Sequence, residues 1–297
     1  MIAGIVYAVL SGLSFALIAV AFRWAQDRSV RPIIVSTSLG LFGAVAFATQ
    51  CRGDWLSAPI RVWVAAVASG STQYLMARLI RVALGRGPVT SFWCAANLGF
   101  LVVVAYSSAC LREAMGAMQV AAVAAGVAGV VAASFTGGKG AVRSIRQGSR
   151  LAYALILAGL LLTSGVMGSA IKDLSVRVIA DDGGTMLTVH GNTFFVVAYG
   201  VLGLLGAADV AAGGGLHATF RQVLPVGLLA GVATTVGMFF LALAAPHPAA
   251  VVFTVSSATS ILFASSLSLV LFRERPTPAW CATVAFTTLA LLLGAMT

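Results

Sequence analysis

The chain has 297 residues, of which 60% are apolar and only 9% are charged. Soluble domains average about 25% charged residues, so this composition excludes an ordinary water-soluble globule. The formal net charge is +10 at pH 7, and the basic residues stand between apolar stretches. In that position they set membrane topology and contact anionic head groups, so we expect a lipid bilayer and not nucleic acid as the partner.

Ten apolar blocks follow one another along the chain. Each is close to the roughly 20 residues that cross a bilayer as a helix. Their apolar residues are continuous and do not alternate, which favours helices over a strand barrel. The sequence therefore predicts an all-α membrane protein with ten transmembrane helices, at residues 2–22, 33–50, 62–84, 89–110, 115–136, 151–172, 188–208, 223–244, 249–272 and 279–296.

The third block carries polar side chains at membrane depth. Gln73 and Tyr74 lie near its middle, and Arg78 follows Tyr74 by about one helical turn on the same face. An ionisable residue inside a membrane is costly and is a functional hypothesis by default. Arg78 could bind a carboxylate or phosphate of a substrate, or its side chain could extend to the interface. All three residues are candidate substrate-binding residues.

The fourth block carries Trp93 and Asn97, four residues apart and thus on one helical face. Trp93 could form a wall of a substrate cavity or belong to the interfacial aromatic belt. Asn97 could contact a substrate or bind a neighbouring helix. After this block, Glu113 stands at the entry to the fifth block, where a carboxylate favours the positive end of a helix dipole. We therefore assign Glu113 a structural role.

Residues 137–150 form a polar, basic linker at the midpoint of the chain. They separate an N-terminal unit of five helices, residues 1–136, from a C-terminal unit of five helices, residues 151–297. The second unit offers hydroxyl groups at mid-depth that could line a polar cavity or allow close helix packing. These further candidates for substrate binding are Thr234, Thr235, Ser256 and Ser257.

The two units look like a repeat. Pro88 opens the fourth block and Pro248 opens the ninth, 160 residues later. Glu274 follows the ninth block as Glu113 follows the fourth, and we assign it the same structural role at a helix entry. Because each unit has an odd number of spans, the two units would insert in opposite orientations. This arrangement is an inverted repeat, which is common in secondary transporters.

One segment of each unit, Pro88 to Gly129 in the first and Pro248 to Gly294 in the second, resembles the drug/metabolite transporter superfamily, specifically its ten-helix EamA-type members. In that family a glycine usually precedes the glutamate, whereas here Arg112 and Arg273 stand in its place. The resemblance implies a cavity walled by the third, fourth, eighth and ninth spans. It also implies transport of small molecules, often export.

We therefore expect a secondary transporter that works by alternating access, as a monomer or a dimer, in a prokaryotic-type inner membrane. The first substrate choice is an amino acid, particularly an aromatic or apolar one. The alternatives are an anionic metabolite such as a sugar phosphate, a lipid-linked substrate of a flippase, and a role as a subunit of a membrane complex. No nucleophile, phosphate-loop or metal motif is present in the sequence, so we expect no enzyme activity, cofactor or metal.

Charge predicts the orientation. The side that faces the loops after odd-numbered spans has 13 Lys and Arg residues, and the side with both termini has 5. The positive-inside rule then places both termini outside. The resemblance implies the opposite orientation, with both termini inside.

Overall fold

The computed structural model describes residues 2–28, 30–51, 55–84, 93, 95–134, 150–178, 189–213, 220–271 and 278–296. The regular structure of these residues is entirely helical, which confirms the prediction of an all-α protein. The helices are α1 (Ile2–Asp27), α2 (Pro32–Ala48), α3 (Ile60–Leu84), α5 (Phe100–Cys110), α6 (Ala117–Ser134), α8 (Arg150–Arg177), α9 (Val189–Ala212), α10 (Phe220–Ala244), α11 (Ala249–Leu271) and α12 (Pro278–Ala295), with a short 3₁₀ turn at Trp55–Ser57.

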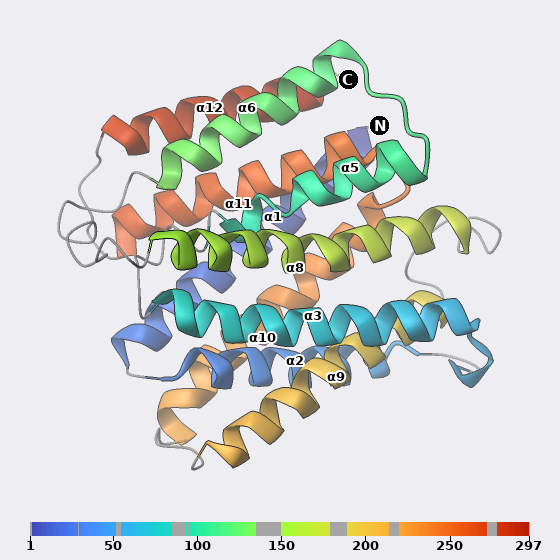
Figure 1. The fold of residues 1–297 in the computed structure, drawn as a ribbon, viewed down its shortest axis with the longest axis vertical. Helices are drawn as coiled ribbons and strands as arrows, with labels where there is room; N and C mark the ends of the chain where they lie inside the picture. Colours follow the sequence, from blue (N-terminus) through green and yellow to red (C-terminus); the bar gives the residue numbers. More distant parts are fainter. Residues whose placement is uncertain are drawn as a thin grey trace.

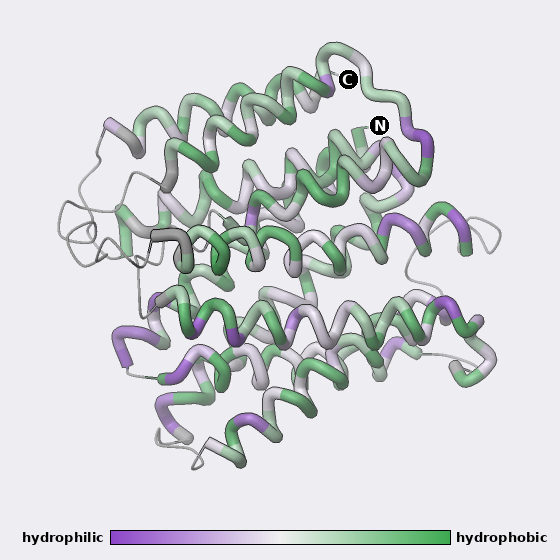
Figure 2. Tube along the Cα trace, viewed as in Figure 1, coloured by the Kyte–Doolittle hydropathy of each residue, from purple (hydrophilic) through white to green (hydrophobic). Residues whose placement is uncertain are grey.

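The lengths and the hydropathy of these helices fit a multi-pass membrane protein. Among the described residues, α1, α8, α9, α10 and α11 are long and apolar enough to cross a membrane. Four shorter helices, α2, α5, α6 and α12, are also apolar. Figure 2 shows apolar residues along most of the length of the helices. α3 is 25 residues long but contains three arginines.

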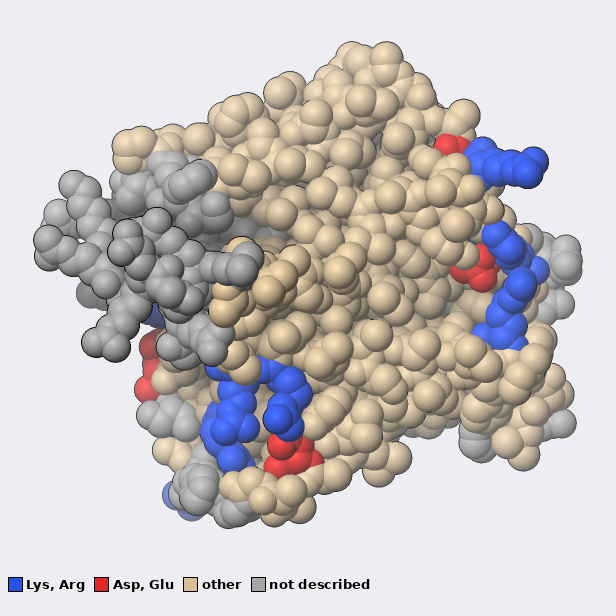
Figure 3. All heavy atoms as spheres, in the orientation of Figure 1, with Lys and Arg blue, Asp and Glu red and all other residues tan. Residues whose placement is uncertain are grey.

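The helices lie side by side and run between two opposite ends of the molecule (Figure 1). We call one the terminus end, because α1 begins and α12 ends there. The other is the linker end, where α6 ends and α8 begins. Figure 3 shows charged side chains mainly toward these two ends of the visible face. By their places in the helices, the described basic side chains lie toward the linker end in Arg23, Arg28, Arg31, Arg78, Arg81 and Arg221, and toward the terminus end in Arg61, Arg112, Lys172 and Arg177.

The packing of the helices follows a paired pattern. To see it, α1, α2, α3, α5 and α6 are matched in order with α8, α9, α10, α11 and α12. The contact of α1 with α10 then corresponds to that of α8 with α3, and the contact of α1 with α11 corresponds to that of α8 with α5. Likewise α2 packs against α10 as α9 packs against α3. The pairs α2–α9 and α6–α12 join corresponding helices of the two units. Most interhelical contacts thus recur when the first five helices are exchanged for the last five.

Glycines let several of these helices approach closely. A methyl group on Gly12 of α1 would collide with the backbone carbonyl of Ser256 in α11, and one on Gly70 of α3 would collide with that of Ala198 in α9. The core beside α9 is aromatic: the Phe47 and Phe195 rings stack with their centroids 4.5 Å apart. Such contacts replace the hydrophobic driving force that helices lack in lipid.

Two helices extend further than predicted, and their additional residues include charged ones. α8 continues to Arg177 and α9 to Ala212, beyond the predicted ends at 172 and 208. Asp173 and Asp209, assigned to loops by hydropathy, therefore lie within helices. A turn at Leu98 and Gly99 separates the helical residues 95–97 from α5. The linker from 137 to 149, Pro88 and Glu274 lie outside the described residues.

Candidate functional site

Two adjoining cavities lie between helices of both units. Their volumes are about 140 and 200 Å³, and they share lining residues, including Phe15, Gln73, Asn97 and Ser164. The larger one extends toward the linker end, past Phe22 of α1 and Ile80 of α3. The smaller one extends toward the terminus end, where Ile171, Leu241 and Phe253 line it. We refer to both together as the central cavity.

Six of the nine predicted substrate-binding residues line the central cavity. Gln73, Trp93, Asn97 and Thr234 line the larger part, and Ser256 and Ser257 line the smaller part. The walls also include residues from α1, α2, α8 and α9, beyond the four spans that the resemblance implied. Ser260 also lines the larger part, and it belongs to the hydroxyl groups of the ninth block that the sequence offered. The polar lining residues that the sequence did not indicate are Ser36, Ser164 and Tyr199.

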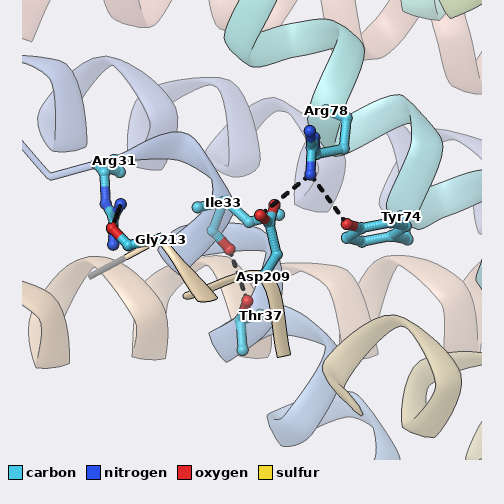
Figure 4. A network of polar contacts seen from close by, with 7 residues as sticks. All are labelled: Arg31, Ile33, Thr37, Tyr74, Arg78, Asp209 and Gly213. Carbon is cyan, nitrogen blue, oxygen red and sulfur yellow. Dashed lines mark hydrogen bonds and ion pairs between the residues drawn. The ribbon is translucent and has the colours of Figure 1, made fainter. Parts of the chain in front are cut away.

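Tyr74, Arg78 and Thr235 are not among the described lining residues. Arg78 instead forms an ion pair of 3.0 Å with Asp209 of α9, and its Nη1 also donates a hydrogen bond of 3.2 Å to the Tyr74 hydroxyl (Figure 4). The Asp209 side chain is 13% exposed and the Arg78 side chain 48%. Neither side chain had an assigned protein partner in the sequence prediction, because hydropathy placed Asp209 in a loop.

The turn at the start of α5 borders the cavity. The chain turns at Leu98 and Gly99, just after Asn97, and Ser164 of α8 donates a hydrogen bond of 2.7 Å to the carbonyl of Ala96. A methyl group on Gly99 would collide with the Ser164 side chain, so the two helices meet closely here. The Gly99 backbone stays in the right-handed helical region, and the Gly99 N–H donates to the Ala96 carbonyl at 3.1 Å, so the turn tightens the helix and leaves its hydrogen bonds in place. The Asn97 side-chain N–H donates to the Trp93 carbonyl at 2.9 Å, and this bond does not use the side-chain oxygen of Asn97, which can accept from another group.

Lys172 of α8 joins three segments at the terminus end, and its side chain is fully buried. Its ammonium group lies 2.6 Å from Glu113, which follows α5, and donates to the carbonyls of Ala245 and His247 between α10 and α11. Glu113 also accepts a hydrogen bond of 3.0 Å from the N–H of Ala249. We call this arrangement the Lys172 junction.

The position of Glu113 refines its predicted structural role. We expected it at the start of the helix that it precedes, but α6 begins only at Ala117. Its carboxylate instead meets the N-terminus of α11, where it can interact with that helix dipole. Arg112 beside it has a φ of 57°, in the left-handed region. The sequence could not show this, because the partner helix lies about 136 residues away.

A second polar cluster at the same end links α5 to α8. The Tyr106 hydroxyl donates to Asp173 at 2.7 Å, and Asp173 forms an ion pair of 3.0 Å with Arg177. Arg177 also donates to the carbonyl of Cys110 at 2.9 Å. Together with the Lys172 junction, this cluster ties the terminus end of α8 to the end of α5.

Charge is confined to the two ends of the site. Among the described residues that line the central cavity, no side chain is Asp, Glu, Lys, Arg or His. Nor do any three His, Cys, Asp or Glu side chains in the described part of the chain stand close enough to hold a metal ion. The cavity therefore offers hydroxyl, amide, thioether and aromatic groups.

No protein-family model and no curated protein matches the chain. Its fold does occur among solved structures. One crystal structure, described only as that of a protein, superposes with a TM-score of 0.73 and 16% sequence identity, over 97% of this chain and 96% of that chain. At this identity the likeness concerns the fold alone.

Proposed function

We propose that the protein is a ten-helix secondary transporter of small organic molecules, similar to EamA-type drug/metabolite transporters. The observation that carries the proposal is the central cavity, which lies between helices of both units and is lined by uncharged polar groups. Transporter sites are formed near the bilayer midplane between repeats. The paired pattern of helix contacts supports two inverted units of five helices.

Alternating access explains the contrast between the two ends. The larger cavity extends toward the linker end, whereas the Lys172 junction joins three segments just beyond Ile171 at the terminus end. The positive-inside rule favours a cytoplasmic linker end. In our proposal this conformation is open toward the cytoplasm of a prokaryotic-type cell, and the Lys172 junction closes the opposite side. Export would then load substrate from the linker end.

Amino acids remain the first substrate class to test, particularly aromatic or apolar ones. The case for anionic metabolites depended on a cavity arginine, and Arg78 is already paired with Asp209. We propose that the protein moves its substrate unchanged, without a cofactor.

Counterflow in proteoliposomes tests the proposal. The purified protein is reconstituted with a panel of unlabelled amino acids, nucleobases, sugar phosphates and phenolic alcohols inside, and exchange of the corresponding labelled solute is measured. We expect exchange of at least one solute, and about tenfold slower exchange in Asn97→Ala. Thr235→Val is the control, because its side chain does not line the cavity. If no member of the panel is exchanged, and scrambling of lipid probes is seen instead, the transporter proposal is wrong.

A further inference from the structure

Three hydroxyl groups in the cavity wall are buried without a hydrogen-bond partner among the described residues. They belong to Tyr199 of α9, Thr234 of α10 and Ser260 of α11, which are 2%, 3% and 1% exposed. All three line the larger part of the central cavity. Leaving a buried hydroxyl unpaired costs free energy, so a rotation of these side chains toward a polar ligand in the cavity would supply the missing hydrogen bonds.

The surroundings of these hydroxyls disfavour a charged ligand. No described lining residue is Asp, Glu, Lys, Arg or His, and a charge at membrane depth is costly without a partner. Two charged residues that follow lining residues in the sequence are already paired. Lys172 follows the lining residue Ile171, but its ammonium group is held by Glu113, and Arg78 is held by Asp209.

The rest of the wall suits an apolar body. Phe15, Phe22 and Trp93 supply aromatic rings, and Met76 and Met238 supply adaptable thioether side chains. Small-molecule sites commonly combine such an apolar wall with a few convergent polar groups that fix orientation. Gln73 and Asn97 add amide groups on the opposite unit of the chain.

We propose that the cavity selects uncharged molecules that have an aromatic or apolar body and hydrogen-bonding groups on one edge. Tyr199, Thr234 and Ser260 bind that edge, since each hydroxyl can donate and accept. Nucleobases and phenolic alcohols have this chemistry, whereas zwitterionic amino acids and anionic metabolites do not. This inference rests on the proposed transport function and replaces amino acids, the first substrate class named there, by uncharged molecules.

Matched ligand pairs test the inference. Binding of uracil is compared with that of orotate, its carboxylated derivative, and binding of tyrosol with that of tyrosine, by titration calorimetry on the purified protein. We expect the uncharged member of a pair to bind at least tenfold more tightly. Tyr199→Phe, Thr234→Val and Ser260→Ala should each weaken its binding about 3- to 10-fold, the usual effect of one lost hydrogen bond. Thr235→Val, next to Thr234 but outside the lining, should leave binding unchanged.

Counterflow with the same ligands separates failure of this inference from failure of the proposed function. If orotate or tyrosine is exchanged and the uncharged partner is not, the protein is a transporter but the inference is overturned. Equal effects of Thr234→Val and Thr235→Val would also overturn it, because the hydroxyl of the lining residue would then have no special role. If none of the four ligands binds or is exchanged, the inference fails, and exchange of any other solute would still support transport.

Discussion

Lys172 and Glu113 form an ion pair of 2.6 Å that joins α8 to the segment that follows α5. The methylene stem of a lysine is easily buried, but its ammonium group is almost never fully buried unless it is paired. Here the ammonium group contacts one carboxylate and two carbonyls. Its three N–H donors thus have three acceptors, which accounts for complete burial of a charged side chain.

Removing one member of this pair should destabilise the protein strongly. Lys172→Met leaves the Glu113 carboxylate without its counter-charge, and breaking a buried pair in this way costs about 3–5 kcal/mol. We expect the midpoint of thermal unfolding in detergent to fall by about 5–15 °C. The double variant Lys172→Met/Glu113→Gln should lose less than the sum of the two single variants.

The matched control for this prediction is Arg23→Gln. Arg23 and Asp27 form an exposed pair at 4.0 Å, and exposed pairs contribute about 0–1 kcal/mol. A loss in Arg23→Gln as large as that in Lys172→Met would contradict a special role of the Lys172 junction.

Gln73 and Tyr74 are neighbours in α3 with different surroundings. Gln73 lines the cavity, whereas the Tyr74 hydroxyl accepts a hydrogen bond from Arg78 outside it. We expect Gln73→Ala to weaken binding of a transported solute about tenfold or more, and Tyr74→Phe to change it less than twofold. Titration of the tryptophan fluorescence, to which Trp93 in the cavity wall contributes, measures both. The reverse order of effects would place the binding site beside Arg78.

Close helix contacts predict a contrast between two glycines. Gly70→Ala introduces a methyl group against the backbone of Ala198 and should destabilise the protein by about 1–3 kcal/mol. A methyl group on Gly200 of α9 would meet nothing within 4 Å, so Gly200→Ala should be neutral or stabilising by up to about 1 kcal/mol through helix propensity. Thermal unfolding of both variants, measured side by side, checks the order.

His247 predicts a loss of stability in acid. Its imidazole lies in the turn between α10 and α11, where burial and the positive charge of Lys172 lower its pKa from 6.5. The unfolded chain therefore binds the proton more readily below about pH 6.5, and stability falls as the pH drops from there through the lowered pKa. Unfolding midpoints between pH 5 and 8 should fall less steeply in His247→Gln than in the original protein. Identical slopes would show that other groups cause the acid response.

The course of the helices could largely be predicted from hydropathy, because long apolar runs admit no other structure in lipid. The polar ends of the helices could not be predicted from hydropathy, because α8 and α9 continue beyond their last apolar residues into charged sequence. Asp209 and Asp173 were therefore assigned to loops, and the partner of Arg78 was missed. Periodicity offered little help with the cavity, because apolar residues cover both the lipid-facing and the core-facing sides of these helices. Tyr199 illustrates this: nothing in its local sequence distinguishes a ring packed on Phe47 from one that also reaches a cavity.

The Lys172 junction determines which substitutions the turn between α10 and α11 can accept. Lys172 binds the main-chain oxygens of residues 245 and 247, and Glu113 accepts from the main-chain nitrogen of residue 249. Replacement of the side chain at 247 leaves those contacts in place, whereas Ala245 and Ala249 are fully buried and have room only for small side chains. Proline at 249 would also remove the N–H that donates. Distant homologues could therefore vary position 247 and keep the same closure, provided that they retain one lysine, one glutamate and small residues on either side.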